Sequence, residues 1–502
     1  MRPPRHRILA LAGLAVCALV AVVHAWPSVE TTVDDAWISA RYAWHLAEGH
    51  GLVYNAGEPP VEGYTNLLWV LWLALVHTLG LPVYGAMTWG GLAWALAGLG
   101  SALGLARELA GRWHPALLLA PAMLALSPHY VVSATNGIES AMFTAGLLGA
   151  TWAALAARTN PARVGVGAAF MLLGMVRPEG SVLAVIVSLW ALWQGRGLDR
   201  WVLPVSAGLG QLAILIWRLL TYGDVVPNTL HAKSNLGLWR VFELNARYLG
   251  MDGPYWPFVG LLLLAAVLLP PRRAARGLVA VMAVTLALVA LRVHMWMPAA
   301  RLFVPVLALT VCAVVAPLAA PSPRPGWRPW VAGALLLSSV AAALSLGDRV
   351  RAYDRRHSVL AENPAALAAR HLAAHAPEGS WLAVRDAGVV AYHASPRIKV
   401  AELHDRALTL PHPDGAPLDL ALIPREPEFI VLTQAREHAR GFRYDNDRAV
   451  FQRADADYVY MGRVYQHHHR YYDFYAREDV AVPPFPPGLV VNSDGPRKGQ
   501  SR

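Results

Sequence analysis

The sequence has little charge for its length. Of 502 residues, only 15% are Asp, Glu, Lys or Arg, whereas 56% are hydrophobic. A soluble protein of this size rarely has so few charges, so the composition predicts an integral membrane protein. A net charge of +10 can indicate a protein that binds nucleic acid. Here the basic residues lie mostly in loops between apolar runs, as in cytoplasmic loops of membrane proteins, so we expect no nucleic-acid partner.

Cysteine is also scarce. The two cysteines, Cys17 and Cys312, both lie inside apolar runs, so we expect no disulfide. A clear A-x-A cleavage site is missing after the basic and then apolar N-terminus, MRPPRHRILALAGLAVCALVAVVHAW. We therefore interpret this segment as a first transmembrane helix rather than a cleaved signal peptide.

What the sequence has instead is long apolar runs, and a helix that crosses a bilayer needs about 20 mostly apolar residues. About eleven hydrophobic segments qualify as candidates: Ile8–Trp26, Leu67–Leu79, Val83–Ala106, Pro115–Val132, Ile138–Ala157, Val164–Trp193, Trp201–Leu220, Phe258–Leu269, Leu278–Val293, Leu302–Ala319 and Val331–Leu346. The predicted fold class is therefore a polytopic α-helical membrane protein, with a transmembrane domain over residues 1–347.

The character of the chain changes after Gly347. Charged residues become frequent, and strand-like runs such as WLAVRDAGVV alternate with helical ones such as PAALAARHLAAH. This pattern predicts a soluble C-terminal α/β domain over residues 348–485. The Pro- and Gly-rich residues 486–502 are typical of a disordered tail.

The basic residues predict the orientation in the membrane. They place the N-terminus in the cytoplasm, and they place the first loop (27–64) and the C-terminal domain outside, in the periplasm. Successive loops must alternate between the two sides of the membrane, and all strongly basic loops should be cytoplasmic. This charge parity holds only if Leu67–Leu79 does not cross fully. It also favours a hairpin of two half-length helices over Val164–Trp193, broken at RPEG, although one long kinked helix fits the spacing as well.

On this topology the polar clusters between the apolar runs all face the outside. They are Asp34 and Asp35 with Glu62 and Tyr64, then Asn136 and Glu139 in NGIES, Arg177 and Glu179 in RPEG, Asn228, His231 and Lys233 in TYGDVVPNTLHAKSN, and Arg301. Carboxylates at a membrane interface are costly unless they are paired or functional.

These residue types suit transfer of a sugar from a lipid phosphate. A carboxylate takes the proton of an acceptor hydroxyl, and cations such as Arg177, His231, Lys233 and Arg301 stabilise the leaving phosphate. Aromatic side chains such as Tyr64 stack on sugar rings. A divalent metal beside the two adjacent acids is chemically reasonable, but a phosphate held by Arg and Lys does not require one. We assign no cofactor and no metal ligands.

Each of these residues also has a purely structural interpretation. Asp34 is suited to cap the helix that starts near Ala36. Arg41 is either a partner of Asp35 or a surface residue, and Glu62 is an ordinary loop acid on spacing alone. Arg177 and Glu179 are close enough in sequence to pair with each other.

The stretch from Asp34 to Trp69, DDAWISARYAWHLAEGHGLVYNAGEPPVEGYTNLLW, resembles over its full length the first outer loop of a bacterial family of GT-C glycosyltransferases. Within this family it is most similar to the mycobacterial terminal β-(1→2) arabinofuranosyltransferases. Weaker matches follow in the same order: NGIES, RPEG, Y-G-x-x-x-P-N-T with a following A-K, R-x-F-V-P from Arg301, and D-x-G from Asp386.

The resemblance implies a GT-C fold, a polyprenyl-phosphate-linked sugar donor, and a glycan or lipid acceptor on the outer face of the bacterial inner membrane. It also implies that the catalytic carboxylate is Asp34 or Asp35, with Asp34 favoured as the first acid of the motif. Glu62 resembles the second loop acid of lipid A aminoarabinose transferases, which lies near the donor.

Two other classes of function compete with this interpretation. A multi-span transporter or channel would need ionisable residues deep inside several spans, and the apolar runs here are nearly free of charge. A membrane-anchored binding or scaffold protein would need only one or two spans to display the C-terminal domain, so about eleven apolar segments argue against it. A non-catalytic relative that acts as a membrane scaffold stays open as an alternative, since both aspartates could be retained for structure.

Overall fold

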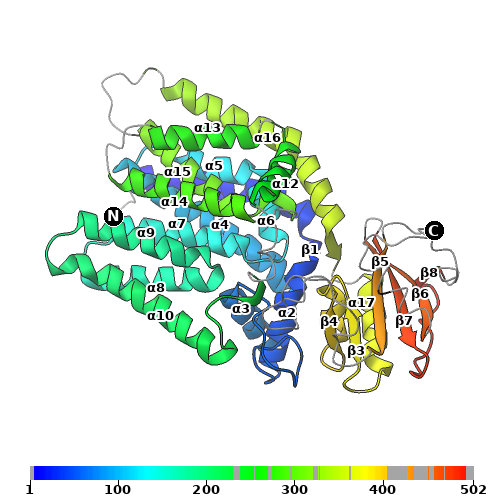
Figure 1. The fold of residues 1–502 in the computed structure, drawn as a ribbon. Coiled ribbons are helices and arrows are strands. Elements are labelled where there is room, and N and C mark those ends of the chain that lie inside the picture. The colour runs from blue at the N-terminus through cyan, green and yellow to red at the C-terminus, as the bar shows by residue number, and fades with distance from the viewer. Residues whose placement is uncertain are drawn as a thin grey trace.

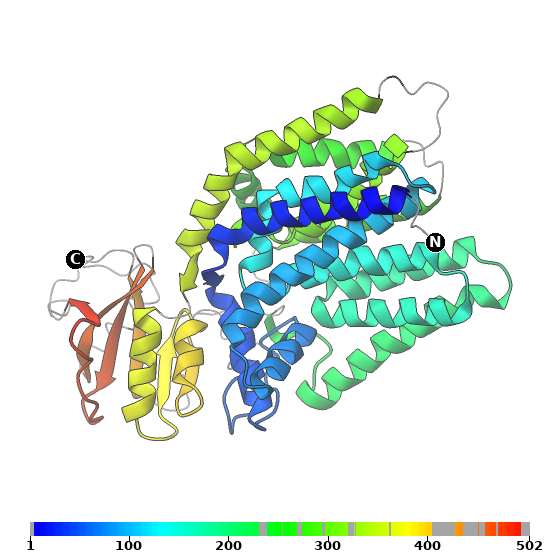
Figure 2. The same ribbon diagram turned by 180° about the vertical axis from the view of Figure 1, so that it is seen from behind.

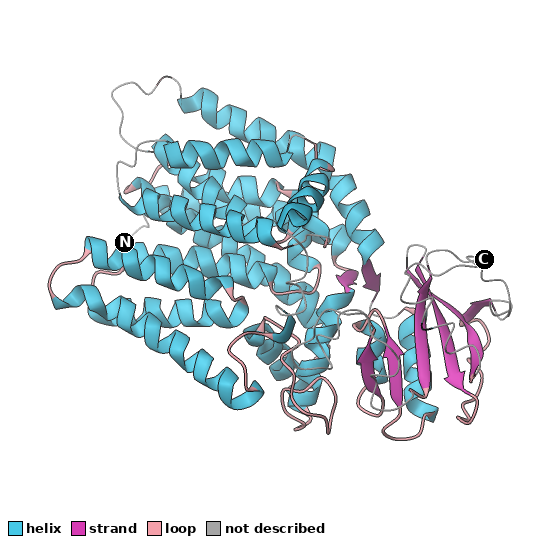
Figure 3. Cartoon of the chain, viewed as in Figure 1, coloured by secondary structure: helices cyan, strands magenta, loops and turns pink. Residues whose placement is uncertain are grey.

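The computed structural model describes residues 5–229, 238–253, 255–268, 274–293, 297–319, 326, 328–360, 363–403, 427–434, 450, 457–467 and 470–492. It consists of a helical bundle followed by a smaller domain built on a mixed sheet (Figures 1 and 3). This is the fold class that the sequence predicted.

The helices of the bundle follow the apolar runs closely. Their bounds are α1 Arg5–Ala25, α2 Asp34–Ala47, α3 Leu67–Thr78, α4 Val83–Ala110, α5 Leu119–Leu126, α6 Pro128–Thr135, α7 Ser140–Ala156, α8 Asn160–Val176, α9 Glu179–Gln194, α10 Val202–Tyr222, α12 Leu238–Gly250, α13 Tyr255–Leu268, α14 Ala274–Arg292, α15 Val304–Ala319 and α16 Arg328–His357. Short 3-10 turns lie at Trp26–Ser28, Pro115–Leu118, Leu198–Trp201 and Pro298–Ala300.

Fewer of these helices reach membrane-spanning length than the eleven expected segments. Within the described residues, five helices are long and apolar enough to cross a bilayer, or up to seven if two bent pairs each count as one span. One bent pair is α5 with α6, which meet at 58° where Ser127 and Pro128 end one helix and cap the next. Outward-facing apolar side chains such as Leu19 (64% exposed) and Leu220 (83% exposed) suit a lipid environment.

The segment over Val164–Trp193 is a helical hairpin, as the charge parity favoured. Helices α8 and α9 run back against each other (Figure 1), and Arg163 in the first turn of α8 comes within 3.9 Å of Asp199 after α9. The tight turn requires Gly180, because a Cβ there would lie 2.4 Å from the carbonyl carbon of Leu173. Its tip, which carries Arg177, points to the end of the bundle nearer the C-terminal domain (Figure 2).

The expected boundary at residue 348 falls inside a helix. Helix α16 continues to His357, and β2 (Ser358–Leu360) then pairs antiparallel with β1 (Thr31–Val33), directly before Asp34. A six-stranded sheet follows in the order β4-β3-β5-β7-β6-β8. Only the β3–β4 and β3–β5 pairs are parallel among the described strands.

The elements of the C-terminal domain are short. They are β3 Trp381–Val384, β4 Lys399–Glu402, β5 Phe429–Gln434, β6 Tyr458–His467, β7 Arg470–Arg477, β8 Val490–Asn492, α17 Pro364–His375 and α18 Val389–Ala394. Strand β8 lies in the segment expected to be a disordered tail, and residues 493–502 are outside the described residues.

The C-terminal domain is docked on the first loop by a buried arginine. Arg41 on α2 is 1% exposed. It donates to the carbonyl oxygens of Tyr54, at 2.7 Å, and of Ala391 and Ile398. Neither sequence interpretation of Arg41 was right, because it is not a surface residue and none of its hydrogen bonds goes to Asp35.

We expect Arg41→Ala to undock this domain. The substitution leaves several buried acceptors without a donor, and hydrogen bonds to charged groups contribute about 1.5–3 kcal/mol each, so the loss of stability should reach about 3 kcal/mol or more. Thermal unfolding and limited proteolysis of the purified protein would measure it. Arg158→Ala, which removes a 76% exposed side chain, is the matched control. Equal melting temperatures for the two variants would contradict the role of Arg41 in docking the C-terminal domain.

Candidate active site

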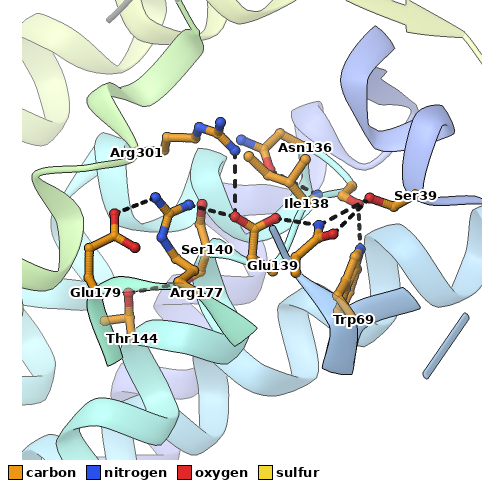
Figure 4. Close-up of polar contacts among 12 residues, drawn as sticks. Ser39, Trp69, Asn136, Ile138, Glu139, Ser140, Thr144, Arg177, Glu179 and Arg301 are labelled. Atoms are coloured by element: carbon orange, nitrogen blue, oxygen red, sulfur yellow. Dashed lines mark hydrogen bonds and ion pairs between the residues drawn. The ribbon is translucent and has the colours of Figure 1, made fainter. Parts of the chain in front are cut away.

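Part of the expected polar set comes together around Glu139, namely Arg177, Glu179 and Arg301 (Figure 4). Glu139, at the start of α7, is 3% exposed. Its Oε1 accepts from Arg177 at 2.6 Å and lies 3.7 Å from Arg301. Its Oε2 accepts from Asn66 at 2.8 Å, and Asn66 in turn bonds to Ser39 on α2.

Arg177 links two carboxylates. Its second amino group donates to Glu179 at 2.7 Å, so the sequence interpretation of an Arg177–Glu179 pair is confirmed, with Glu139 as an additional partner. Burial acts to raise the pKa of Glu139, but the charges of Arg177 and Arg301 outweigh it and hold that pKa below its ordinary value.

Several buried polar atoms in this cluster make no hydrogen bond with the described part of the protein. They are Nδ2 of Asn136, Oγ of Ser140 and Oε2 of Glu179. Buried polar groups are nearly always paired, so atoms of this kind mark positions where a ligand or water is accommodated. A small pocket lies there, with Arg177 and Arg301 at one end and apolar walls from Leu286 and Ala290 of α14.

The two adjacent aspartates occupy different surroundings. Asp34 is 7% exposed and accepts the backbone N–H groups of Gly388, at 2.9 Å, and Val389, at 3.0 Å. Gly388 permits this approach, since a Cβ there would lie 2.0 Å from the carbonyl oxygen of Asp34. Asp35 is less buried, and its charge acts on Arg301.

Asp34 is not the cap of its own helix. Val33 is the N-cap residue of α2, and no side chain caps that helix. The Asp34 carboxylate instead binds the N-terminus of α18 in the C-terminal domain, where N–H groups favour an anion. Burial and the nearby charge of Asp386 raise the pKa of Asp34 to about 7, although the two amide hydrogen bonds act against this.

Glu62 is a buried partner rather than an ordinary loop acid. It is 3% exposed and accepts from Nε of Arg218 on α10 at 3.0 Å. Burial raises the pKa of Glu62 to about 7, against the charge of Arg218. The backbone carbonyl of Glu62 accepts from the N–H of Asn228, which ties the first loop to the end of α10.

The remaining expected residues lie around these groups. The hydroxyl of Tyr64 shares a hydrogen bond of 2.8 Å with that of Tyr222. The carbonyl of Asn136 accepts from Val33 at 2.9 Å, next to Asp34. His231 and Lys233 lie outside the described residues, and the described residues bring together no group of three His, Cys, Asp or Glu side chains that could hold a metal ion.

Three residues near the site went unnoticed in the sequence: Arg218, Asn66 and Ser39. A single arginine inside the apolar run of α10 was a usable signal for Arg218, because a charge in such a run needs a partner. Asn66 and Ser39 carry no comparable signal, since their importance depends on how α2 and α7 approach each other.

No family model matches this chain, and no curated protein sequence matches it. Solved structures do. ArnT from Cupriavidus metallidurans, bound to undecaprenyl phosphate, superposes with a TM-score of 0.57 and 14% identity, covering 93% of this chain and 97% of that one. The oligosaccharyltransferase AglB from Archaeoglobus fulgidus, with an inhibitory peptide and dolichol-phosphate, gives 0.54 and 11%, covering 90% and 69%.

A second structure of the Archaeoglobus fulgidus enzyme, with zinc and sulfate, gives a TM-score of 0.52 at 13% identity and covers 78% of this chain, and this chain spans 62% of its length. At these identities the similarity shows the fold alone. The chain therefore has the GT-C fold, as the sequence predicted.

Glu139 and Glu62 are both buried acids with an arginine partner, and they make a matched pair for a stability test. Glu139→Gln leaves Arg177 and Arg301 without their shared counter-ion, and breaking a buried pair costs about 3–5 kcal/mol. Glu62→Gln should cost less at pH 7, because a carboxyl with a pKa of about 7 is already half neutral there.

Thermal unfolding at pH 7 would compare the two variants. We expect the melting temperature to fall clearly further for Glu139→Gln, and an equal or larger fall for Glu62→Gln would contradict the assigned charge states.

Proposed function

We propose that the protein is an inverting glycosyltransferase. In this proposal it moves a sugar from a polyprenyl-phosphate donor to a glycan or lipid acceptor on the outer face of the bacterial inner membrane. The observation that supports it most is that Asp35 acts on Arg301, beside Arg177 and a small pocket with apolar walls, while Asp34 directly precedes Asp35 in the first turn of α2. A base, cations for a phosphate and a wall for a lipid chain are thus close together.

The fold neighbours support the same class of donor. The ArnT structure holds undecaprenyl phosphate and the AglB structure holds dolichol-phosphate, both polyprenyl phosphates. In this proposal the phosphate binds at Arg301, because a guanidinium group binds phosphate through paired N–H donors, and Leu286 and Ala290 offer apolar contact beside it. The pocket has a volume of only about 10 Å³ in this structure, so the lipid must widen it on binding.

The reaction we propose is one displacement at the anomeric carbon. The acceptor oxygen attacks that carbon while Asp34 takes the hydroxyl proton. The bond from the anomeric carbon to the phosphate oxygen breaks, and the lipid phosphate leaves with the electron pair, stabilised by Arg301. Asp34 has two lone pairs left after accepting two amide hydrogens, and its pKa of about 7 suits a base at neutral pH.

The orientation that we propose rests on the position of α1 and of the basic connections between helices. Helix α1 begins at the end of the bundle opposite the C-terminal domain (Figures 1 and 2). The α7–α8 and α9–α10 connections, which carry Arg158 and Arg200, lie at that same far end. With these basic residues in the cytoplasm, the catalytic cluster and the C-terminal domain lie on the periplasmic side.

The first experiment identifies the donor. Membranes that contain the protein are incubated with radiolabelled polyprenyl-phosphate arabinofuranose, mannose, galactose, glucose and an aminosugar. We expect arabinofuranose to be transferred, because the first loop resembles arabinofuranosyltransferases. If no donor is consumed and the purified protein binds none, the transferase proposal is wrong, and transport assays in liposomes then test the alternative of a transporter.

The role of Asp34 has its own test. We expect Asp34→Asn to lower transfer by about 10²–10⁴-fold, the usual contribution of a general base, with a smaller loss for Asp35→Asn. Asn at position 34 turns an NH₂ group toward Gly388 or Val389, so proteolysis must show that the C-terminal domain stays docked. A full loss in Asp35→Asn with activity retained in Asp34→Asn would exchange the two roles.

The pH dependence separates a buried base from an ordinary one. Below its pKa, Asp34 carries a proton and cannot accept another, so kcat/KM should rise with pH through about 7. The acid limb of the profile measures this value in wild-type protein. An acid limb near pH 4, where an ordinary aspartate titrates, would contradict the assignment of Asp34 as the base.

A further inference from the structure

A second cavity opens at the same end of the bundle, away from the Glu139 cluster. It has a volume of about 240 Å³ and lies between the end of α6, the α12–α13 turn, the turn before Arg301 and α16. Figure 1 shows α12 beside α16 at the end that faces the C-terminal domain. None of the residues that line it was expected in the site: His129, Tyr248, Asp252, Arg349, Ala352 and Tyr353 are among them.

The cavity has hydrogen-bonding groups that the protein does not use. Both bonds to Asp252, from Nε2 of His129 and Nε1 of Trp256, end on Oδ2 at 2.8 Å, and Oδ1 accepts none from the described residues. Nδ1 of His129 is buried and also has no partner there. Arg349 is exposed and forms no hydrogen bond or ion pair with the described part of the chain.

The remaining walls are aromatic and small. The rings of Tyr248 and Tyr353 lie 5.7 Å apart at 77°, and Ala299 and Ala352 leave room beside them. One carboxylate and one guanidinium balance each other, so the cavity has no net charge to attract a phosphate. Aromatic surface with a few convergent polar groups is typical of a site for a small, neutral, hydrogen-bonding ligand.

The cavity adjoins the turn that carries Arg301. Ala299 lines it, and Ala299 and Ala300 both have left-handed backbone angles, with φ of 61° and 43°, which cost energy for a residue with a Cβ. The Tyr248 hydroxyl holds this turn, since it donates to the carbonyl of Met297 at 2.5 Å and accepts from the N–H of Ala300 at 3.1 Å. A ligand in the cavity therefore lies directly against the segment that positions Arg301.

We infer that this cavity is an acceptor subsite that binds one sugar residue of a neutral glycan. The inference rests on the proposed transferase function and makes the acceptor a glycan rather than a lipid head group. The sugar ring packs on Tyr248 or Tyr353, and its hydroxyls donate to Oδ1 of Asp252 and accept from Arg349. The bound residue lies beyond the point of transfer, so it contributes to acceptor affinity and not to the chemical step.

Two variants on α16 test the subsite, with a third as the control. Arg349→Ala removes an exposed donor, and Ala352→Trp fills the cavity. Arg355→Ala removes another exposed arginine of the same helix, one that does not line the cavity. Calorimetric titration of the purified full-length variants with neutral arabinofuranose, galactose and mannose oligosaccharides, without donor, measures the affinity directly.

We expect at least one of these glycans to bind the wild type and Arg355→Ala equally. The affinity should fall about 10-fold in Arg349→Ala, as for one lost charged hydrogen bond, and binding should be lost in Ala352→Trp. In transfer assays the same two variants should raise the KM for the acceptor and leave donor binding unchanged.

The subsite is overturned if the wild type binds none of the oligosaccharides at millimolar concentration, or if both variants bind them as the wild type does. It is also overturned if phosphatidylglycerol vesicles, and not the glycans, bind in an Arg349-dependent way. Because the titrations contain no donor, weaker glycan binding in the variants would support the subsite even if no donor sugar were ever transferred.

Discussion

The hydrogen bonds that tie α2 to the C-terminal domain hold the rest of the site in place. Arg41 donates to backbone carbonyls on both sides of this seam, and Asn55 bonds to the backbone N–H and carbonyl of Val400. A buried guanidinium is stable only when its donors are used, so the first loop and the domain order together. The antiparallel pairing of β1 with β2 joins the first loop to the chain entering the C-terminal domain, directly before Asp34.

The two faces of helix α2 contact different parts of the protein. Asp34, Trp37 and Arg41 follow a helical spacing and all face the C-terminal domain, where the Trp37 ring lies 4.9 Å from that of Tyr392. Asp35 and Ser39 point toward Arg301 and the Asn66–Glu139 bonds. Successive residues on a helix are about 100° apart, which places one acid at the seam and the other at the arginines. In the displacement that we propose, the base and the leaving group lie on opposite sides of the reacting carbon, and the separation of Asp34 from the arginines is consistent with that requirement.

The parts of this arrangement that the sequence predicts are those with a local signature. Apolar runs predicted most of the helices, Pro178 and Gly180 predicted the hairpin, and the distribution of basic residues predicted that Glu139, Arg177 and Arg301 share one end of the bundle. The buried role of Arg41 could not be predicted, because its acceptors are backbone carbonyls that any residue supplies. The continuation of α16 past Gly347 was missed for a related reason: a helix that leaves the apolar layer becomes charged without ending. The docking of Asp34 on Gly388 depends on residues more than 350 positions apart, for which one sequence has no local signal.

The charge balance of the cluster restricts how a phosphate can bind there. Arg177 and Arg301 face three acids, Glu139, Glu179 and Asp35, so the group carries a net negative charge before any donor arrives. Both terminal amino groups of Arg177 also donate hydrogen bonds to carboxylates. A lipid phosphate at Arg301 would add charge of the same sign, which costs free energy in a site with little water unless another cation approaches. In the proposed reaction, the approach of a further cation would therefore decide whether the first-loop acids stay ionised while the phosphate is bound.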